Sequence, residues 1–434
     1  MPTQPSRSFR LVCAPEQISR VESLLGAQGF LFEDEPFFSF GRRLLHSPFP
    51  LGSSLAARFG YIYIQDRSSM LPPLALGPGS GGAVLDMCAS PGSKTGLLAG
   101  LVGKSGFVLG NEPSRKRLGT LRMNLRQQDL LCCATCSYPG EELPLPDAEG
   151  SGGRYPGWRW IQLDPPCSGW GTVEKNPQVT RLWQGDKVKP LIGLQRQLLR
   201  EAFRLLRPGG MLAYSTCTTN VEENEEQIRF ALGALDLELC PLEDLPGFRL
   251  GESDMPGVWR VEPGEDGQGF FVALLRKKGP SIADSDHVGA VQYPPEWRLL
   301  RPDALDSACV DSGLLPEGGI ADFNGVLHFI PAAAPGLLPV PFVWKGFPVG
   351  RVDRSGRVRP DPCLRSLMPS PEQVGKAGGD CINLEEIDTL SGLLSGQSIA
   401  VDAKNNEIAL YFRDLPLTRL TVKGRRAVLP PLRA

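Results

Sequence analysis

Between Ala83 and Cys217, short apolar segments alternate with segments of helical periodicity, and this alternation limits the folds that the chain can adopt. The segments expected to be strands cover residues 83–88, 107–112, 130–136, 158–164 and 211–217. Helices are expected at 94–102, 114–128, 195–206 and 222–235. Strands that alternate with helices build a parallel, doubly wound sheet with helices on both faces. We therefore predict an α/β fold of the Rossmann-like type.

The regions on either side of this alternation differ from it. Residues 1–75 contain one helical pattern, from Gln17 to Gly29, and predict a small N-terminal α/β region. The central domain is expected to run over 76–278. Its last two apolar segments, 257–263 and 269–278, flank a short polar turn and predict a terminal hairpin.

The character of the chain changes again after Lys278. Residues 279–296 predict a linker, and residues 297–434 predict one or two small β-rich modules with many Pro and Gly residues. A length of 434 residues agrees with two or three domains. No apolar run is long enough to span a bilayer, and the N-terminus has no signal-peptide pattern, so we expect a cytoplasmic protein.

Cysteine and histidine usage restricts the chemistry. The 11 cysteines are odd in number and have no secretory context, so we expect reduced thiols. The three histidines, His46, His287 and His328, lie far apart in the sequence. A histidine-based metal site or catalytic triad is therefore not expected.

Basic residues gather at both ends of the chain under a formal net charge of -2. The C-terminal group comprises Arg419, Lys423, Arg425, Arg426 and Arg433. The N-terminal group comprises Arg7, Arg10, Arg20, Arg42, Arg43, Arg58 and Arg67. We favour solvated surface charge as the interpretation, and a local basic face for nucleic acid is the alternative.

The segment DMCASPGSKT, residues 86–95, joins an expected strand to a helix N-terminus through a loop of small residues. Such a loop binds anionic or carboxylate groups, and Gly92 permits a close approach of the ligand. A Walker A loop needs glycine directly before its lysine, but Ser93 precedes Lys94, and no G-x-G-x-x-G pattern occurs here. The remaining common occupant is S-adenosylmethionine. The residues expected to bind it are Cys88, Ala89, Ser90, Pro91, Gly92, Ser93 and Lys94.

Glu112 ends the second expected strand. An acid at this place accepts hydrogen bonds from ribose hydroxyls in nucleotide-binding folds. The alternative is an acid that favours the start of the following helix. We favour ribose binding, and Arg117 is expected to support the same pocket.

The fourth and fifth expected strands end in reactive residues. In LDPPCSGWG, two prolines fix a rigid loop that holds Asp164 at the rim of the sheet, with Cys167 three residues further on. Cys217 ends the next strand, in YSTCTTNVEENE. We expect Asp164, Cys167 and Cys217 to converge beside the cofactor loop, where reactive thiols are favoured over packing residues. Asp164 is expected to contact the cofactor as well.

Two thiols and a carboxylate beside S-adenosylmethionine suit methylation of carbon 5 of a pyrimidine. A thiolate that adds to carbon 6 makes carbon 5 nucleophilic, and an acid at the nitrogen edge stabilises the developing charge. The second cysteine can assist release of the product. The other cysteine cluster, Cys132-Cys133-x-x-Cys136, resembles half of a zinc site, but no second half follows, so we favour a buried strand.

The segments QDRSSMLPPLAL, LDMCASPGSKT, LDPPCSGWGTVEKNP and LRPGGMLAYSTCTTNVEENE resemble the Nop/Sun-type RNA 5-methylcytosine methyltransferases over about residues 65–278. The resemblance implies a Rossmann-like methyltransferase sheet with S-adenosyl-L-methionine as cofactor. It implies that Cys217 is the nucleophile, that Cys167 assists product release, that Asp164 is the catalytic aspartate and that Glu112 binds the ribose.

The tail, from VWKGFPVGRVDRSGRVRPDPCLRSL to LSGLLSGQSI, is similar to the C-terminal extension of bacterial ribosomal-RNA members of that family. This similarity implies a PUA-like RNA-binding module in residues 297–434, and residues 1–75 are expected to bind RNA too. Ribosomal RNA or a ribosomal subunit is the first expected partner and transfer RNA the second. A monomer is expected, with no metal and no membrane partner.

One departure from the family concerns the acid that contacts adenine after the third strand. Pro139-Gly140 stands in its place, so backbone groups, Glu141 or Glu142 are the alternatives. Trp170 is expected either to stack on the substrate base or to pack.

Three other functions are alternatives to an RNA cytosine methyltransferase. A DNA cytosine-5 methyltransferase would use Cys167 as nucleophile, and Cys217 argues against it. A P-loop ATPase is not expected, because Ser93 stands where the Walker A motif needs glycine. A non-catalytic RNA-binding protein would be expected to lack one of Asp164, Cys167 and Cys217.

Overall fold

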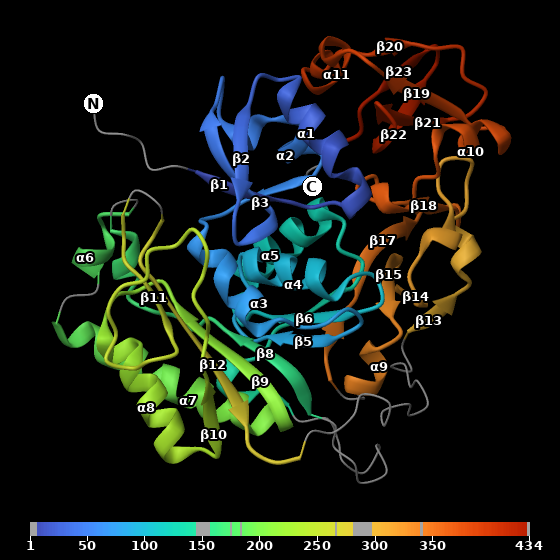
Figure 1. The fold of residues 1–434 in the computed structure, drawn as a ribbon. Coiled ribbons are helices and arrows are strands. Elements are labelled where there is room, and N and C mark those ends of the chain that lie inside the picture. The colour runs from blue at the N-terminus through green and yellow to red at the C-terminus, as the bar shows by residue number, and fades with distance from the viewer. Residues whose placement is uncertain are drawn as a thin grey trace.

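The computed structural model describes residues 7–144, 157–173, 176–182, 185–264, 267–280, 297–338 and 342–431. The linker predicted at 279–296 lies, from residue 281 onward, outside the described residues. Figure 1 shows a large central sheet with the N-terminal and C-terminal parts of the chain packed together on one side of it. Within these ranges, no helix combines the length and apolar character needed to cross a bilayer.

The central sheet confirms the predicted doubly wound α/β fold. Its main path runs β10-β12-β9-β8-β5-β6-β7-β16. The strands are β5 (Ala83–Asp86), β6 (Phe107–Asn111), β7 (Cys133–Cys136), β8 (Trp158–Leu163), β9 (Leu206–Thr216), β10 (Leu237–Cys240), β12 (Phe270–Lys277) and β16 (Trp344–Lys345). The chain first builds β5, β6 and β7 outward, then returns to place β8 on the other side of β5. The strand order therefore reverses between β5 and β8, which is where such sheets bind ligands.

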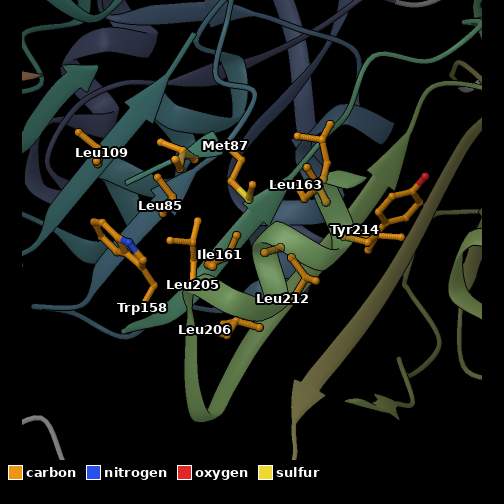
Figure 2. Packing of buried hydrophobic residues seen from close by; sticks show 14 of the residues in the cluster. Leu85, Met87, Leu109, Trp158, Ile161, Leu163, Leu205, Leu206, Leu212 and Tyr214 are labelled. Carbon is orange, nitrogen blue, oxygen red and sulfur yellow. The ribbon is translucent and has the colours of Figure 1, made fainter. Parts of the chain in front are cut away.

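Helices cover both faces of this sheet, as the apolar periodicity predicts. They are α3 (Leu71–Leu76), α4 (Ser93–Val102), α5 (Arg115–Gln128), α7 (Lys189–Leu205) and α8 (Glu225–Ala234). Side chains of β5, β8 and β9 pack against α7 in a buried core, part of which is shown in Figure 2. Packing of this kind fixes the strand ends, and so the loops that follow them.

Three sequence expectations for the central domain need correction. The helix predicted from residue 195 starts at Lys189. Pro190 lies in its first turn, where a residue without an N–H is tolerated. The strand predicted from residue 211 starts at Leu206, so β9 includes Pro208-Gly209-Gly210. The helix predicted at 222–235 is broken at Asn224, whose side chain is tied to Thr216 and Thr218.

The predicted hairpin forms between β11 (Trp259–Val261) and β12. β12 also pairs antiparallel with β9 and β10, so it lies inside the sheet. The opposite edge is closed by β16, a two-residue strand from the C-terminal part that pairs antiparallel with β7. The sequence contained no signal for this contribution.

The C-terminal part contains two five-stranded sheets, in agreement with the predicted β-rich modules. The first contains β13 (Arg298–Leu300), β14 (Gly318–Phe323), β15 (Val326–Pro331), β17 (Phe347–Val352) and β18 (Val358–Pro360). The second contains β19 (Asp380–Leu384), β20 (Ile399–Ala400), β21 (Glu407–Phe412), β22 (Leu415–Lys423) and β23 (Arg426–Val428). Its helices are α10 (Pro371–Lys376) and α11 (Ile387–Leu394).

The N-terminal region is a four-stranded antiparallel sheet with two helices. Its elements are β1 (Ser8–Leu11), α1 (Ile18–Gly26), β2 (Leu31–Glu35), β3 (Phe38–His46), α2 (Leu55–Arg58) and β4 (Ile62–Ile64). It shares one hydrophobic core with the second C-terminal sheet, where Phe9 and Leu24 cluster with Leu410 and Phe412. The two ends of the chain therefore form a single packed unit. Small sheets bury too little apolar surface to be stable alone, and this union supplies more.

Several basic residues interpreted from the sequence as solvated surface charge are buried instead. Arg10, Arg42, Arg67 and Arg419 are each 3% exposed. Arg42 and Arg67 pair with Glu22 and Glu35, and Arg10 donates to glutamine side chains. The prediction of surface charge was wrong for these residues because composition cannot distinguish a buried arginine, hydrogen-bonded to acceptors, from an exposed one.

Candidate active site

The loop after β5 is held against α5 by side-chain contacts. Arg117 Nη2 donates to the carbonyl of Ser90 at 3.0 Å, and Ser90 Oγ donates to the carbonyl of Arg117 at 3.0 Å. Asn124 Nδ2 donates to the carbonyl of Pro91 at 2.8 Å. Gly92 has a φ of +104°, and a Cβ there would lie 3.1 Å from Leu121 Cδ1. Glycine therefore lets the loop turn sharply into the N-terminus of α4.

Glu112 follows β6 directly, and its side chain is 2% exposed. Its Oε1 accepts a hydrogen bond from the backbone N–H of Ser114 at 2.8 Å, and its Oε2 lies 3.4 Å from Arg117 Nη1. Glu112 therefore lies at the start of α5, as the helix-start alternative expects, and beside Arg117, while its binding of ribose stays a prediction. Arg117 links Glu112 to the loop after β5.

Asp164 follows β8 and lies between two partners. Lys94 Nζ donates to its Oδ2 at 2.7 Å, and Ser215 Oγ donates to its Oδ1 at 2.9 Å. Burial alone would lower the pKa of Lys94, but the Asp164 carboxylate outweighs burial and raises it. A charged lysine therefore faces the Asp164 carboxyl group, and the Asp164 side chain keeps 29% of its surface exposed.

Cys167 and Cys217 meet at the ends of neighbouring strands, as predicted. Their sulfur atoms are 3.3 Å apart. The hydrogen bond from Cys167 lowers the pKa of the Cys217 thiol, against the effect of burial, and nearby Lys94 lowers it further. The same hydrogen bond and burial raise the pKa of Cys167. The lowered pKa favours the thiolate, which is the reactive form of cysteine, so Cys217 is the candidate nucleophile of the two.

Burial has the opposite effect on other cysteines. It raises the pKa of Cys88 and of Cys136. Cys132, Cys133 and Cys136 are buried at β7, which agrees with the packing interpretation of that cluster. Among the described residues, no group of three or more Cys, His, Asp or Glu could hold a metal ion.

A buried carboxylate, Glu223, organises the two cysteine loops, and sequence reasoning did not identify it. Its oxygens accept hydrogen bonds from the backbone N–H of Ser168 at 2.9 Å and from its hydroxyl at 2.5 Å. Gln195 of α7 donates to it at 3.0 Å, and Asn220 at 3.2 Å. The acidic run VEENE predicts only the start of a helix, and its sequence gives no indication that Glu223 is fully buried.

The backbone also holds the Cys217 loop in place. The N–H of Gly171 donates to the carbonyl of Cys217 at 3.1 Å, and the N–H of Gly269 donates to the carbonyl of Gly171 at 2.9 Å. A Cβ on Gly171 would lie 2.3 Å from the carbonyl oxygen of Gly269. This position therefore requires glycine for close packing.

The segment expected to contact adenine is fixed by Asn111. The Asn111 side chain donates to the carbonyl of Tyr138 at 3.0 Å and accepts from its N–H at 2.9 Å. Glu141 and Glu142 are exposed on a short 3-10 helix. Trp170 lies on another short 3-10 helix beside the cysteine loops and is half-buried.

The donors and acceptors at this edge fit S-adenosyl-L-methionine. A methionine carboxylate needs N–H donors, which the loop before α4 offers. Ribose hydroxyls need an acceptor such as Glu112, and a sulfonium needs a nearby carboxylate such as Asp164. All of these groups lie at the carboxyl ends of β5, β6 and β8.

Comparisons with known proteins agree with this geometry. The family described as 16S rRNA methyltransferase RsmB/F matches residues 73–276. A ribosomal RNA small subunit methyltransferase F of Shewanella amazonensis is 32% identical over 371 residues, which cover 81% of this chain and 78% of that protein. The protein of the same name from Cronobacter sakazakii is 39% identical over 256 residues, but the match spans only 52% of its length and 57% of this chain.

A solved structure shows the same fold. The crystal structure of a methyltransferase homolog protein from Pyrococcus horikoshii is 32% identical, with a TM-score of 0.53. The match covers 63% of this chain and 87% of that one.

Proposed function

Because the chain belongs to the RsmB/F family of 16S rRNA methyltransferases, we propose that it methylates carbon 5 of a cytosine in 16S ribosomal RNA. The methyl donor is S-adenosyl-L-methionine. The observation that carries the proposal is the pair of thiols 3.3 Å apart, with the lowered pKa on Cys217, beside the Asp164–Lys94 ion pair.

The reaction starts with the Cys217 thiolate, which forms a bond from its Sγ to carbon 6 of the cytosine. The electron pair of the 5,6 double bond then makes carbon 5 nucleophilic. Asp164 accepts a hydrogen bond from the 4-amino group, and Lys94 places positive charge beside the ring. The bound cofactor supplies the methyl group that carbon 5 takes.

Release of the product needs two further events. The carbon 5 proton must leave to a base, and the bond between carbon 6 and Cys217 must break. Cys167 is the residue assigned to this elimination, because its sulfur lies beside that of Cys217. Its raised pKa keeps it protonated during the addition. It must then release that proton to solvent, after which the Cys167 thiolate takes the carbon 5 proton, the electron pair of that C–H bond re-forms the 5,6 double bond, and Cys217 leaves as a thiolate.

The flanking regions are proposed to bind the RNA. Residues 1–75 and the second C-terminal sheet form one unit, so they act together rather than as separate arms. Assignment of residues 297–434 as a PUA-like module, the cytoplasmic location and a monomeric state belong to the same proposal. A cytosine approached from both faces must be single-stranded or flipped out.

The test uses single alanine variants of Cys167 and Cys217, with Cys381→Ala as a matched control because Cys381 is exposed on β19. Each is incubated with S-adenosyl-L-methionine and unmodified 16S rRNA, or with small subunits reconstituted from it. A denaturing gel reports covalent protein–RNA adducts. We expect a stable adduct with Cys167→Ala, none with Cys217→Ala, and normal turnover with Cys381→Ala.

Other results would redirect the assignment. The reverse pattern would make Cys167 the nucleophile, which is the arrangement of DNA cytosine-5 methyltransferases. Methylation of transfer RNA in place of ribosomal RNA would change the substrate. Full methyl transfer by Cys217→Ala would refute the covalent mechanism.

A further inference from the structure

We propose that a cavity between α5 and the first C-terminal sheet binds one nucleotide of the substrate RNA outside the reaction centre, with Arg122 and Lys345 on its phosphate. The cavity has a volume of about 240 Å³. A neighbouring cavity of about 300 Å³ shares Arg122, Thr135 and Lys345 with it. The inference rests on the proposed function, because it names a second contact for the same substrate.

The edge strand β16 builds the cationic wall of this cavity. Its register places Lys345 opposite Thr135 of β7. Arg122 of α5 donates from Nε to Thr135 Oγ1 at 2.9 Å. The two cations therefore lie on either side of one threonine. Gly346 follows, and its Cβ position would lie 2.1 Å from the carbonyl oxygen of Phe329, so the chain passes tightly into β17 there.

Among the described residues, no carboxylate pairs with the positive charge of this wall. Over the part of the chain that the structure describes, no ion pair involves Arg122 or Lys345. Burial lowers the pKa of Lys345, and the charge of Arg122 lowers it further. His328, also in the wall, has its pKa lowered to about 4, first by burial and then by Lys345, while Asp322 acts weakly in the opposite direction. An anion bound here would relieve this repulsion.

The remaining walls are apolar and partly aromatic. Phe323, Phe347 and Leu125 line the cavity, and Lys345 Nζ lies 4.9 Å from the centre of the Phe323 ring. Ligand pockets usually measure about 300–1,000 Å³, so this space suits a single small unit. A nucleotide suits both the cationic and the aromatic parts of the wall. Its base can stack on aromatic rings, and its phosphate can bind guanidinium groups.

The surroundings favour RNA over a free nucleotide. The hairpin of β17 and β18 exposes Arg351, Arg354, Arg357 and Arg359, and Asp353 is the acid paired with one of them. Arg351 lies directly opposite Arg359, so two like charges face one another across the hairpin, and Asp353 offsets only the charge of Arg359. Val326 of the cavity wall is paired with Arg351. The basic hairpin thus continues from the cavity as a track for a phosphate backbone.

The position relative to the reaction centre fits one RNA chain. β7 is three strands from β8 in the order β8-β5-β6-β7, a separation of about 14 Å at ordinary strand spacing. The second cavity reaches Ser137 and Tyr138, which follow β7 at the carboxyl edge of the sheet. This is the edge that carries Asp164 and Cys217, so a few nucleotides span the two sites. In Figure 1, β15 and β17 lie beside the part of the central sheet that contains β5 and β6.

The experiment compares Arg122→Gln, Lys345→Gln and the double variant with Lys104→Gln. Lys104 is exposed in the turn between α4 and β6, at the opposite edge of the sheet, and it is the matched control for loss of one charge. Binding of a short fluorescein-labelled single-stranded RNA of mixed sequence is measured by anisotropy over a range of salt concentrations. Loss of both contacts to this one phosphate should weaken binding about tenfold near 0.15 M salt and reduce the salt slope by about 0.7.

The cofactor affinity and the thermal midpoint of the variants serve as folding controls and should match those of Lys104→Gln. A second readout avoids substitution in the wall: the ring signal of His328 in the intact protein, assigned with His328→Gln, should shift as RNA is added. Unchanged RNA binding and salt slope in the double variant, or a His328 signal that does not move, would overturn the proposal.

The two proposals fail in different ways. If the wild type transfers no methyl group to RNA, the proposed function fails, while the anisotropy and the His328 signal still decide the cavity. If methyl transfer is normal and the double variant binds RNA like Lys104→Gln, only the cavity proposal is wrong. Binding of free cytidine monophosphate that the RNA does not displace would assign the cavity to a mononucleotide and also reject the RNA contact.

Discussion

The sulfur atoms of Cys167 and Cys217 lie 3.3 Å apart, although 50 positions separate the two residues in the chain. One of them must donate the shared proton. The lowered pKa of Cys217 and the raised pKa of Cys167 assign the proton to Cys167. The surroundings therefore give two chemically identical side chains different proton affinities.

Replacement of Cys167 by alanine should raise the pKa of Cys217, because the variant lacks the thiol that stabilises the Cys217 thiolate. Near pH 7.5, alkylation of Cys217 by iodoacetamide should become several-fold slower, since the rate follows the thiolate fraction. The measurement is the pH profile of Cys217 labelling, read by mass spectrometry of the peptide. Cys381→Ala is the control, and an unchanged profile in Cys167→Ala would contradict the assignment.

Substitution of Glu223 by glutamine should disturb both cysteine loops. The carboxylate accepts from Ser168, Gln195 and Asn220, and a glutamine amide turns part of that acceptor set into donors. A buried mismatch of this kind costs about 1–3 kcal/mol of stability.

We expect a lower kcat with little change in KM, and slower labelling of Cys217, because Glu223 positions the loops without touching the substrate. Glu222→Gln is the matched control, since Glu222 is the exposed neighbour. Equal kcat values and midpoints for the two variants would show that the network is dispensable.

A methyl group at position 171 should be poorly tolerated. The Cβ of Gly171→Ala would lie 2.3 Å from the backbone carbonyl oxygen of Gly269, and no side-chain rotation can separate the two atoms. Overpacking of this kind typically costs about 1–3 kcal/mol. Gly193→Ala in α7 is the control, because its Cβ meets nothing within 4 Å and should stabilise the helix by about 0.5–1 kcal/mol. Chemical denaturation of both variants decides the point, and a Gly171→Ala protein as stable as wild type would refute it.

The strand-end residues were predictable because the carboxyl ends of parallel strands share one edge of a sheet. From the sequence alone, that rule predicts that Asp164, Cys167 and Cys217 lie close together, and it predicts the position of the loop around Gly92. The same rule could not find Glu223, whose role depends on Ser168 and Gln195 from two other segments. Long-range polar contacts of this kind leave no periodic pattern in a sequence.

The sequence also did not predict that the N-terminal region and the second C-terminal sheet pack together. Phe9 and Leu410 belong to segments that each look like a small independent sheet, yet they share one core. Arg365 joins these parts to the central domain, where its Nη2 donates to the carbonyls of Gly60 and Gln128, each at 2.9 Å. In the sequence, an arginine that binds buried carbonyls looks the same as a surface arginine. The sequence therefore also predicted Arg10, wrongly, to lie at the surface.

The stability of the protein without ligands should depend on the titration of Asp86. Burial raises the pKa of this carboxyl to about 6, against the hydrogen bond from Thr95. In the unfolded chain the pKa of an aspartate is about 3.9. The folded state therefore binds the proton more tightly, so the stability that Asp86 contributes is fully present below about pH 4 and is lost as the pH rises through about 6.

Asp86→Asn removes this titration and keeps an acceptor for Thr95. Relative to wild type, the variant should gain about 2–3 kcal/mol of unfolding free energy between pH 4 and pH 8, since each pKa unit is worth about 1.4 kcal/mol. Urea denaturation at several pH values measures the difference, and Asp402→Asn, at an exposed position, reports the generic effect of a lost carboxylate. A difference between Asp86→Asn and wild type that stays constant across this range would mean that Asp86 ionises in the folded protein as readily as in the unfolded chain.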